Sequence, residues 1–68
     1  MFYQKLIKEL LGNRDYDPRH IEALMRLQYG TLDHLSRDDF RMEIPICIAC
    51  IKIGGVEAAE KTAKSFGL

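Results

Sequence analysis

Cysteine and histidine are the residue types in this chain best suited to metal or redox chemistry. Cys47 and Cys50 stand in C-x-x-C spacing, which brings two sulfurs to one side of a helix. A structural zinc ion needs four ligands, and only His20 and His34, both upstream of the cysteines, could supply the other two. A thioredoxin-type redox pair needs a β-α-β context that the sequence does not show. We therefore predict that both cysteines pack as buried apolar side chains, and we expect no metal and no cofactor.

The histidines are the only side chains whose ordinary pKa lies near neutral pH. His34 follows Asp33, and a carboxylate beside an imidazole can orient a general base. Adjacent residues rarely face each other, however, and no nucleophile stands near either histidine in the sequence. The pattern predicts surface or capping roles for His20 and His34.

Other catalytic and binding motifs do not fit the sequence. Residues 13–17 carry two aspartates but lack the glycine and terminal glutamate of a calcium loop. No glycine-rich phosphate loop, Ser-His-Asp set or pair of catalytic carboxylates is present. We therefore expect a protein without enzymatic activity.

Length and composition limit the remaining classes of protein. The chain has 68 residues, which suggests a single domain over 1–68. Its 47% hydrophobic content is too high for a disordered chain, and ten basic residues balance ten acidic ones. A net charge of zero gives no long-range attraction for nucleic acid or an anionic membrane. No apolar run is long enough to cross a bilayer, no secretory signal is present, and a cytoplasmic location is expected.

Apolar periodicity and punctuation predict four helices. Gly12 ends the first, Asp17 and Pro18 start the second, and Ser36 with Asp39 forms a capping box for the third. The connecting segment 31–35 carries Leu32 and Leu35, which should point into the core. The predicted helices span residues 2–11, 18–29, 36–53 and 56–66.

The third of these segments decides the fold. Residues 44–53 are rich in isoleucine, which favours a strand, but nothing else in the chain could pair with one except the same strand of a second copy. Pro45 removes a hydrogen bond inside a helix, so we expect a kink or a break there. The prediction is an all-α fold, a small four-helix bundle with a central apolar helix kinked or broken at Pro45.

The third helix has more apolar surface than a monomer can hide. On a helical wheel, one apolar arc holds Phe40, Ile44, Cys47, Ile48 and Ile51. A second arc, on another side, holds Met42, Ile46, Ala49, Cys50 and Ile53, and Glu43 is an isolated polar exception. A surplus of apolar surface marks an interaction site.

Two functional hypotheses follow. The first is a protein–protein interaction module, a regulator, adaptor or inhibitor, that binds another protein or forms a homodimer. Its interface candidates come from the first and third helices: Phe2, Leu6, Leu10, Met42, Ile46, Ala49 and Ile53. The alternative is nucleic-acid binding through an arginine-bearing face, formed by Arg14, Arg19, Arg26, Arg37 and Arg41. Interleaved acidic residues weigh against the alternative.

Overall fold

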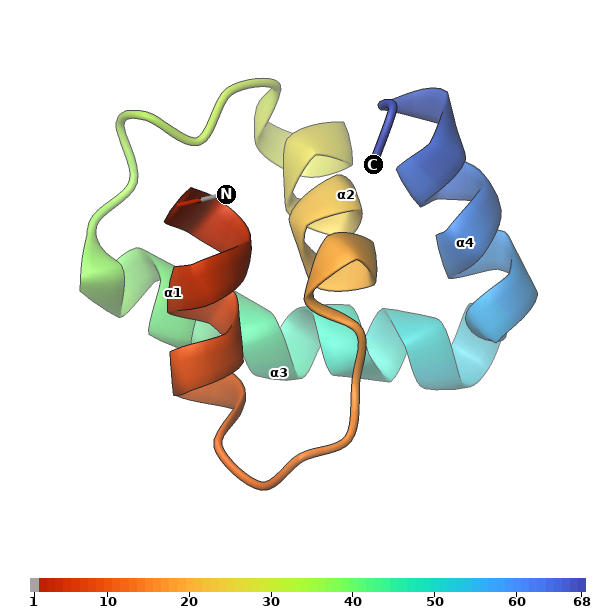
Figure 1. Ribbon diagram of the computed structural model, residues 1–68, viewed down its shortest axis with the longest axis horizontal. Helices are drawn as coiled ribbons and strands as arrows, with labels where there is room; N and C mark the ends of the chain where they lie inside the picture. Colours follow the sequence, from red (N-terminus) through yellow and green to blue (C-terminus); the bar gives the residue numbers. More distant parts are fainter. Residues whose placement is uncertain (1) are drawn as a thin grey trace.

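The computed structural model describes residues 2–68, which form four helices and no strand. The helices are α1 (Phe2–Leu11), α2 (Pro18–Tyr29), α3 (Arg37–Gly54) and α4 (Val56–Ser65). Helices α1, α2 and α4 stand side by side, and α3 runs across all three (Figure 1). Helix α2 also contacts the other three, whereas α1 and α4 do not touch. The prediction of an all-α fold with four helices is confirmed.

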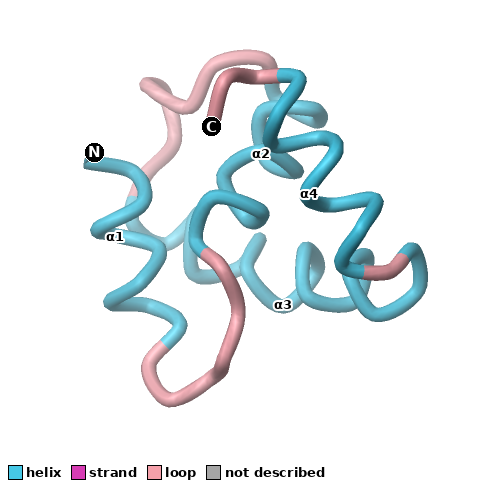
Figure 2. The backbone as a smooth tube through the Cα atoms, turned by 45° about the vertical axis from the view of Figure 1, so that its right-hand side comes forward, coloured by secondary structure: helices cyan, strands magenta, loops and turns pink. Residues whose placement is uncertain are grey.

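The helix ends follow the punctuation of the sequence. The Asp17 carboxylate accepts a hydrogen bond from the backbone N–H of Arg19 at 2.9 Å, which caps α2 directly before Pro18. At α3, the Ser36 hydroxyl accepts from the N–H of Asp39, whose carboxylate accepts from the N–H of Ser36. Two loops join α1 to α2 and α2 to α3, while Gly55 alone separates α3 from α4 (Figure 2).

Helix α3 passes through Pro45 without interruption, so the predicted break there is wrong. The kink stays a prediction. Pro45 and Arg41 are both exposed, so water can satisfy the Arg41 carbonyl that loses its usual helical donor. Residues 44–53 are helical, which rules out the strand alternative. Packing against three helices overrides the strand preference of the isoleucines.

The core is a single cluster of side chains from all four helices and the segment before α3. Helix α3 contributes the predicted arc, with Phe40, Ile44 and Ile51 among its buried members. Leu32 is buried and Leu35 half-buried, as expected for the connecting segment. The other buried hydrophobic residues are Leu6, Ile7, Leu11, Ile21, Ala23, Met25, Cys47, Ile48, Ala59 and Ala63.

Two expectations need correction, and one buried carboxylate was not anticipated. Helix α4 ends at Ser65 rather than Phe66. Its buried residues are Ala59 and Ala63, whereas Val56 and Phe66 are exposed. Glu43 is buried, because it lies on the side of α3 that faces α2. His20, expected at the surface or as a cap, is buried as well.

The size of the molecule matches a compact domain. The radius of gyration is 10.7 Å, close to the value of about 11 Å expected for a folded chain of this length. The fold is therefore not loosely packed. The exposed apolar side chains described below owe their exposure to their positions on the helices. No helix within residues 2–68 combines the length and the hydrophobicity that a bilayer span requires.

Replacing Pro45 should stabilise the protein. We expect Pro45→Ala to raise the free energy of unfolding by about 2 kcal/mol, because the restored N–H can donate a hydrogen bond to the Arg41 carbonyl. The higher conformational entropy of the unfolded variant offsets only part of this gain. Urea unfolding followed by circular dichroism measures this, with the exposed Lys52→Ala as control. An unchanged or lower stability of Pro45→Ala would contradict the expected backbone defect.

Candidate functional site

Exposed apolar side chains gather on one side of α3, away from its core-facing arc. Met42, Ile46 and Ile53 are 70%, 51% and 88% exposed, and Ala49 and Cys50 are also exposed. Neighbouring α2 adds Leu27, which is 67% exposed, and the half-buried Leu24. We call this surface the outer face; it consists of Leu24, Leu27, Met42, Ile46, Ala49, Cys50 and Ile53.

A shallow groove runs along the outer face between α2 and α3. Its volume is about 270 Å³, and its lining is almost wholly apolar: Leu24, Leu27, Gln28, Ile46, Cys47 and Cys50. Gln28 is the only uncharged polar side chain in it, and no charged group lines it. Such a groove suits an apolar side chain of a partner and offers no group that would activate a substrate.

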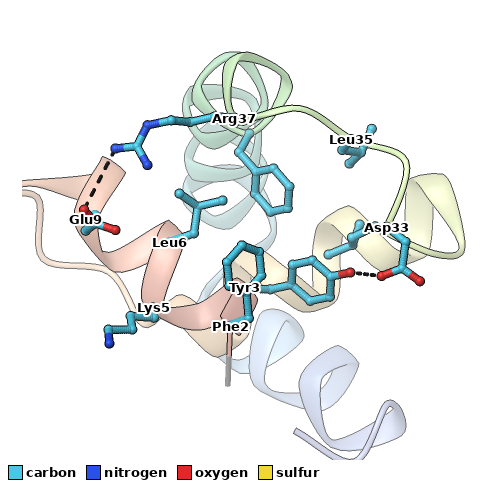
Figure 3. A pocket seen from close by; sticks show the side chains of 10 residues that line it. Phe2, Tyr3, Lys5, Leu6, Glu9, Asp33, Leu35 and Arg37 are labelled. Atoms are coloured by element: carbon cyan, nitrogen blue, oxygen red, sulfur yellow. Dashed lines mark hydrogen bonds and ion pairs between the residues drawn. The ribbon is translucent and has the colours of Figure 1, made fainter.

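A second pocket, of about 310 Å³, lies between the start of α1, the segment 32–35 and the start of α3 (Figure 3). Its floor is apolar and includes Leu6, Leu32 and Phe40. The Tyr3 ring stacks on Phe40 with 5.9 Å between ring centroids. We call it the α1 pocket.

Four polar side chains at the rim of the α1 pocket form two pairs. The Tyr3 hydroxyl donates a hydrogen bond to the Asp33 carboxylate, and Arg37 lies 3.9 Å from a Glu9 oxygen (Figure 3). The hydrogen bond to Asp33 and the nearby negative charge raise the pKa of Tyr3, so the phenol stays protonated at neutral pH. The pocket can accept an apolar group.

The predicted interface residues of α1 divide between the core and the α1 pocket. Phe2 is 73% exposed at the edge of the pocket. Leu6 is a buried core residue that also forms part of the pocket floor, and Leu10 is half-buried. Of these three, only Phe2 presents a broad accessible surface. The α3 candidates, by contrast, lie together on the outer face.

The five predicted arginines are each held by a neighbouring group. Arg14 donates two hydrogen bonds to the backbone carbonyls of Leu10 and Leu11, at 2.9 and 3.0 Å, and so caps the C-terminal end of α1. The other four form ion pairs with carboxylates: Arg19 with Asp17, Arg26 with Glu22, Arg37 with Glu9, and Arg41 with Asp38. Four of the five charges are balanced within the molecule.

A polar cluster between α2 and α4 was not anticipated from the sequence. Nε2 of the buried His20 lies 3.6 Å from a Glu60 oxygen and 3.8 Å from an Asp17 oxygen, and Nε2 itself has no hydrogen-bond partner. Arg19 bonds Asp17 at 2.7 Å and approaches Glu60 at 3.8 Å. The only sign of this cluster in the sequence was Asp17, which stands three residues before His20. Glu60 lies near His20 because α4 packs against α2.

Two further carboxylates lie in the interior. Glu22 is fully buried and accepts a hydrogen bond from Arg26 Nε at 2.8 Å. Glu43 is buried near Tyr29 and Cys47; burial and the Glu43 carboxylate raise the pKa of Tyr29. One oxygen of each glutamate has no partner, so removing the remaining partner of Glu22 would leave a buried charge uncompensated.

The cysteines differ in their surroundings. Cys47 is buried, whereas Cys50 is exposed on the outer face, which corrects the expectation that both would be buried. Burial, together with the nearby Glu43 charge, raises the pKa of the Cys47 thiol to about 12. Within residues 2–68, no three histidine, cysteine, aspartate or glutamate side chains gather closely enough to hold a metal ion.

No family model, curated protein or solved structure matches this chain.

Thiol labelling should separate the two cysteines. In the folded protein at pH 8, iodoacetamide should modify Cys50 and leave Cys47 intact, because a thiol pKa of about 12 leaves almost no reactive thiolate. Mass spectrometry of the Cys50→Ser variant should show no labelling until urea unfolds it. Rapid labelling of folded Cys50→Ser would contradict the burial of Cys47.

Acid should remove the electrostatic contribution of Asp17. Hydrogen bonds from Arg19 lower the pKa of Asp17 below 3.8, so its contribution to stability is present above that pH and is lost as pH falls through the lowered value. Asp17→Asn keeps a capping oxygen but no charge, so it should be less stable than the parent at pH 7, and the difference should be smaller near pH 2. Asp17→Ala should lose about 1 kcal/mol more, the worth of the cap. Unfolding free energies at both pH values test this, and a pH-independent difference between the parent and Asp17→Asn would contradict it.

Proposed function

We propose that this protein is a small helical interaction module, without catalytic activity, that binds another protein surface through its outer face. The main support for this proposal is that Met42, Ile46 and Ile53 are exposed in one line along α3, beside the apolar groove. Contiguous exposed apolar surface of this kind marks an interaction site more often than scattered exposed residues do.

The burial of these side chains can drive binding. Fully burying a leucine, isoleucine or methionine side chain contributes about 1.5–3 kcal/mol. Met42, Ile46, Ile53 and Leu27 are all at least half exposed, so their burial supplies a favourable free energy of several kcal/mol. This is of the size needed to offset the entropy lost on association.

The α1 pocket is a weaker candidate for the primary site. Its rim carries Lys5, Glu9, Asp33 and Arg37, two of which bind each other and one of which binds Tyr3. A partner would have to compete with these contacts or leave them in place. The outer face requires no such exchange, because its groove carries no charged group.

Nucleic-acid binding remains the alternative, but the ion pairs weigh against it. An arginine that contacts a phosphate must leave its carboxylate partner, and the freed carboxylate then repels the same phosphate. Arg19, Arg26, Arg37 and Arg41 all have such partners.

The free thiols Cys47 and Cys50 suit a reducing, cytoplasmic location.

A charge placed on the outer face should abolish partner binding. We expect tagged Ile46→Glu to lose proteins that the parent captures from lysate of its native cell, because a partner would have to desolvate the new carboxylate. Ala58→Glu, at an exposed position of α4, is the matched control and should retain them. Helical content by circular dichroism shows that both variants are folded.

Nuclease treatment of the same lysate separates the two hypotheses. Under the interaction hypothesis, the captured proteins survive nuclease and depend on Ile46. Recovery of nucleic acid that is lost with nuclease but kept in Ile46→Glu would favour the arginine-bearing face instead. Binding through that face should also weaken steeply with salt.

A further inference from the structure

We propose that the partner of the outer face is the same face of a second copy, with the two α3 helices antiparallel about a twofold axis. This inference rests on the proposed function, since it names the occupant of that site. A twofold axis requires a surface that is complementary to itself. The spacing of the outer-face residues along α3 and the two flanks of the face meet that requirement.

The spacing along α3 is symmetric about its centre. Residues 42, 46, 49 and 53 are separated by four, three and four positions, the repeat of a helix that packs on another helix. An axis midway between Ile46 and Ala49 brings Ile46 of one copy against Ala49 of the other, and Met42 against Ile53. Each large side chain of the central pair then meets a small one. A parallel pair would instead oppose Ala49 to Ala49 and leave a void, which is unfavourable.

The two flanks of the outer face also favour the antiparallel arrangement. One flank continues through Cys50 to Leu24 and Leu27 of α2. The other flank is polar: it carries Lys52 and Arg41, both exposed and turned about 120° or more from Ile46 around the helix, and Arg41 pairs with Asp38. An antiparallel twofold places each flank beside its own counterpart, so the apolar groove of one copy adjoins that of the other. A parallel pair would place the apolar flank against the polar one.

The outer face lies on the longest helix of the molecule. A standard interface buries about 800 Å² on each partner, which is less than a fifth of the 4496 Å² surface of this chain. Helix α3, with 18 residues, is about 27 Å long and spans the full 27 Å length of the molecule. Figure 1 shows α3 running across the molecule, and the outer-face positions 42–53 cover about 16 Å of its length.

Sedimentation of the purified chain tests the self-association. We expect the mass to rise with concentration to twice the 7.8 kDa of one chain. Ile46→Glu should raise the dissociation constant about tenfold or more, as expected for a residue central to an interface, and Ala58→Glu should leave it unchanged. A monomer at every concentration up to about 1 mM, where even the weakest specific association is populated, would overturn the inference.

Disulfide trapping tests the orientation, using a Cys50→Ser background to remove the exposed native thiol. The double variant Met42→Cys with Ile53→Cys should form a covalent dimer on mild oxidation, whereas each single variant should not. The two new cysteines lie about 16 Å apart within one helix, too far to bridge in one chain. Covalent dimers from the single variants would show a parallel pair and overturn the proposed orientation.

The two proposals fail in different ways. If the chain is monomeric yet captures a different protein that Ile46→Glu loses, the outer face is an interaction site but its occupant is not a second copy. If Ile46→Glu changes neither capture nor the association state, both proposals are wrong. A dimer trapped only by the double variant supports both.

Discussion

The packing of one side of α3 against the other three helices is the interaction on which the fold depends. Phe40, Ile44 and Ile51 lie in the core, and α1 and α4 do not touch each other, so α3 and α2 hold the two ends of the molecule together. This packing keeps α3 helical over 18 residues, although its isoleucines prefer a strand and Pro45 lacks the backbone N–H donor. The defect is tolerable because it lies on the exposed side.

The same helix gives the domain its exposed apolar surface. A helix that is apolar on two sides can bury only one of them in a domain of this size, since a small chain hides a limited fraction of its surface. Met42, Ile46 and Ile53 remain outside while the opposite side is buried. The outer face follows directly from the orientation that the core imposes on α3.

Ionic groups are largely balanced inside the molecule. Arginine–carboxylate pairs link neighbouring turns in α2 and α3 and connect α1 to α3 through Glu9 and Arg37. The cluster of Asp17, Arg19, His20 and Glu60 connects α2 to α4. Most of these pairs are exposed and each contributes little to stability. Because of these pairs, four of the five arginines already have an anionic partner within the molecule.

The sequence by itself determined the helices, their ends to within one residue and the two apolar arcs of α3, because caps such as Asp17 and Ser36 and the 3.6-residue period are local properties. It also placed Met42, Ile46, Ala49 and Ile53 on one side of the helix. Only the tertiary structure decided that this side faces outward, that Pro45 leaves α3 unbroken, that Glu22, Glu43 and His20 are buried, and that Glu60 reaches His20. Those outcomes depend on which helix covers which side, and contacts between residues far apart in the chain have no periodic signal in the sequence.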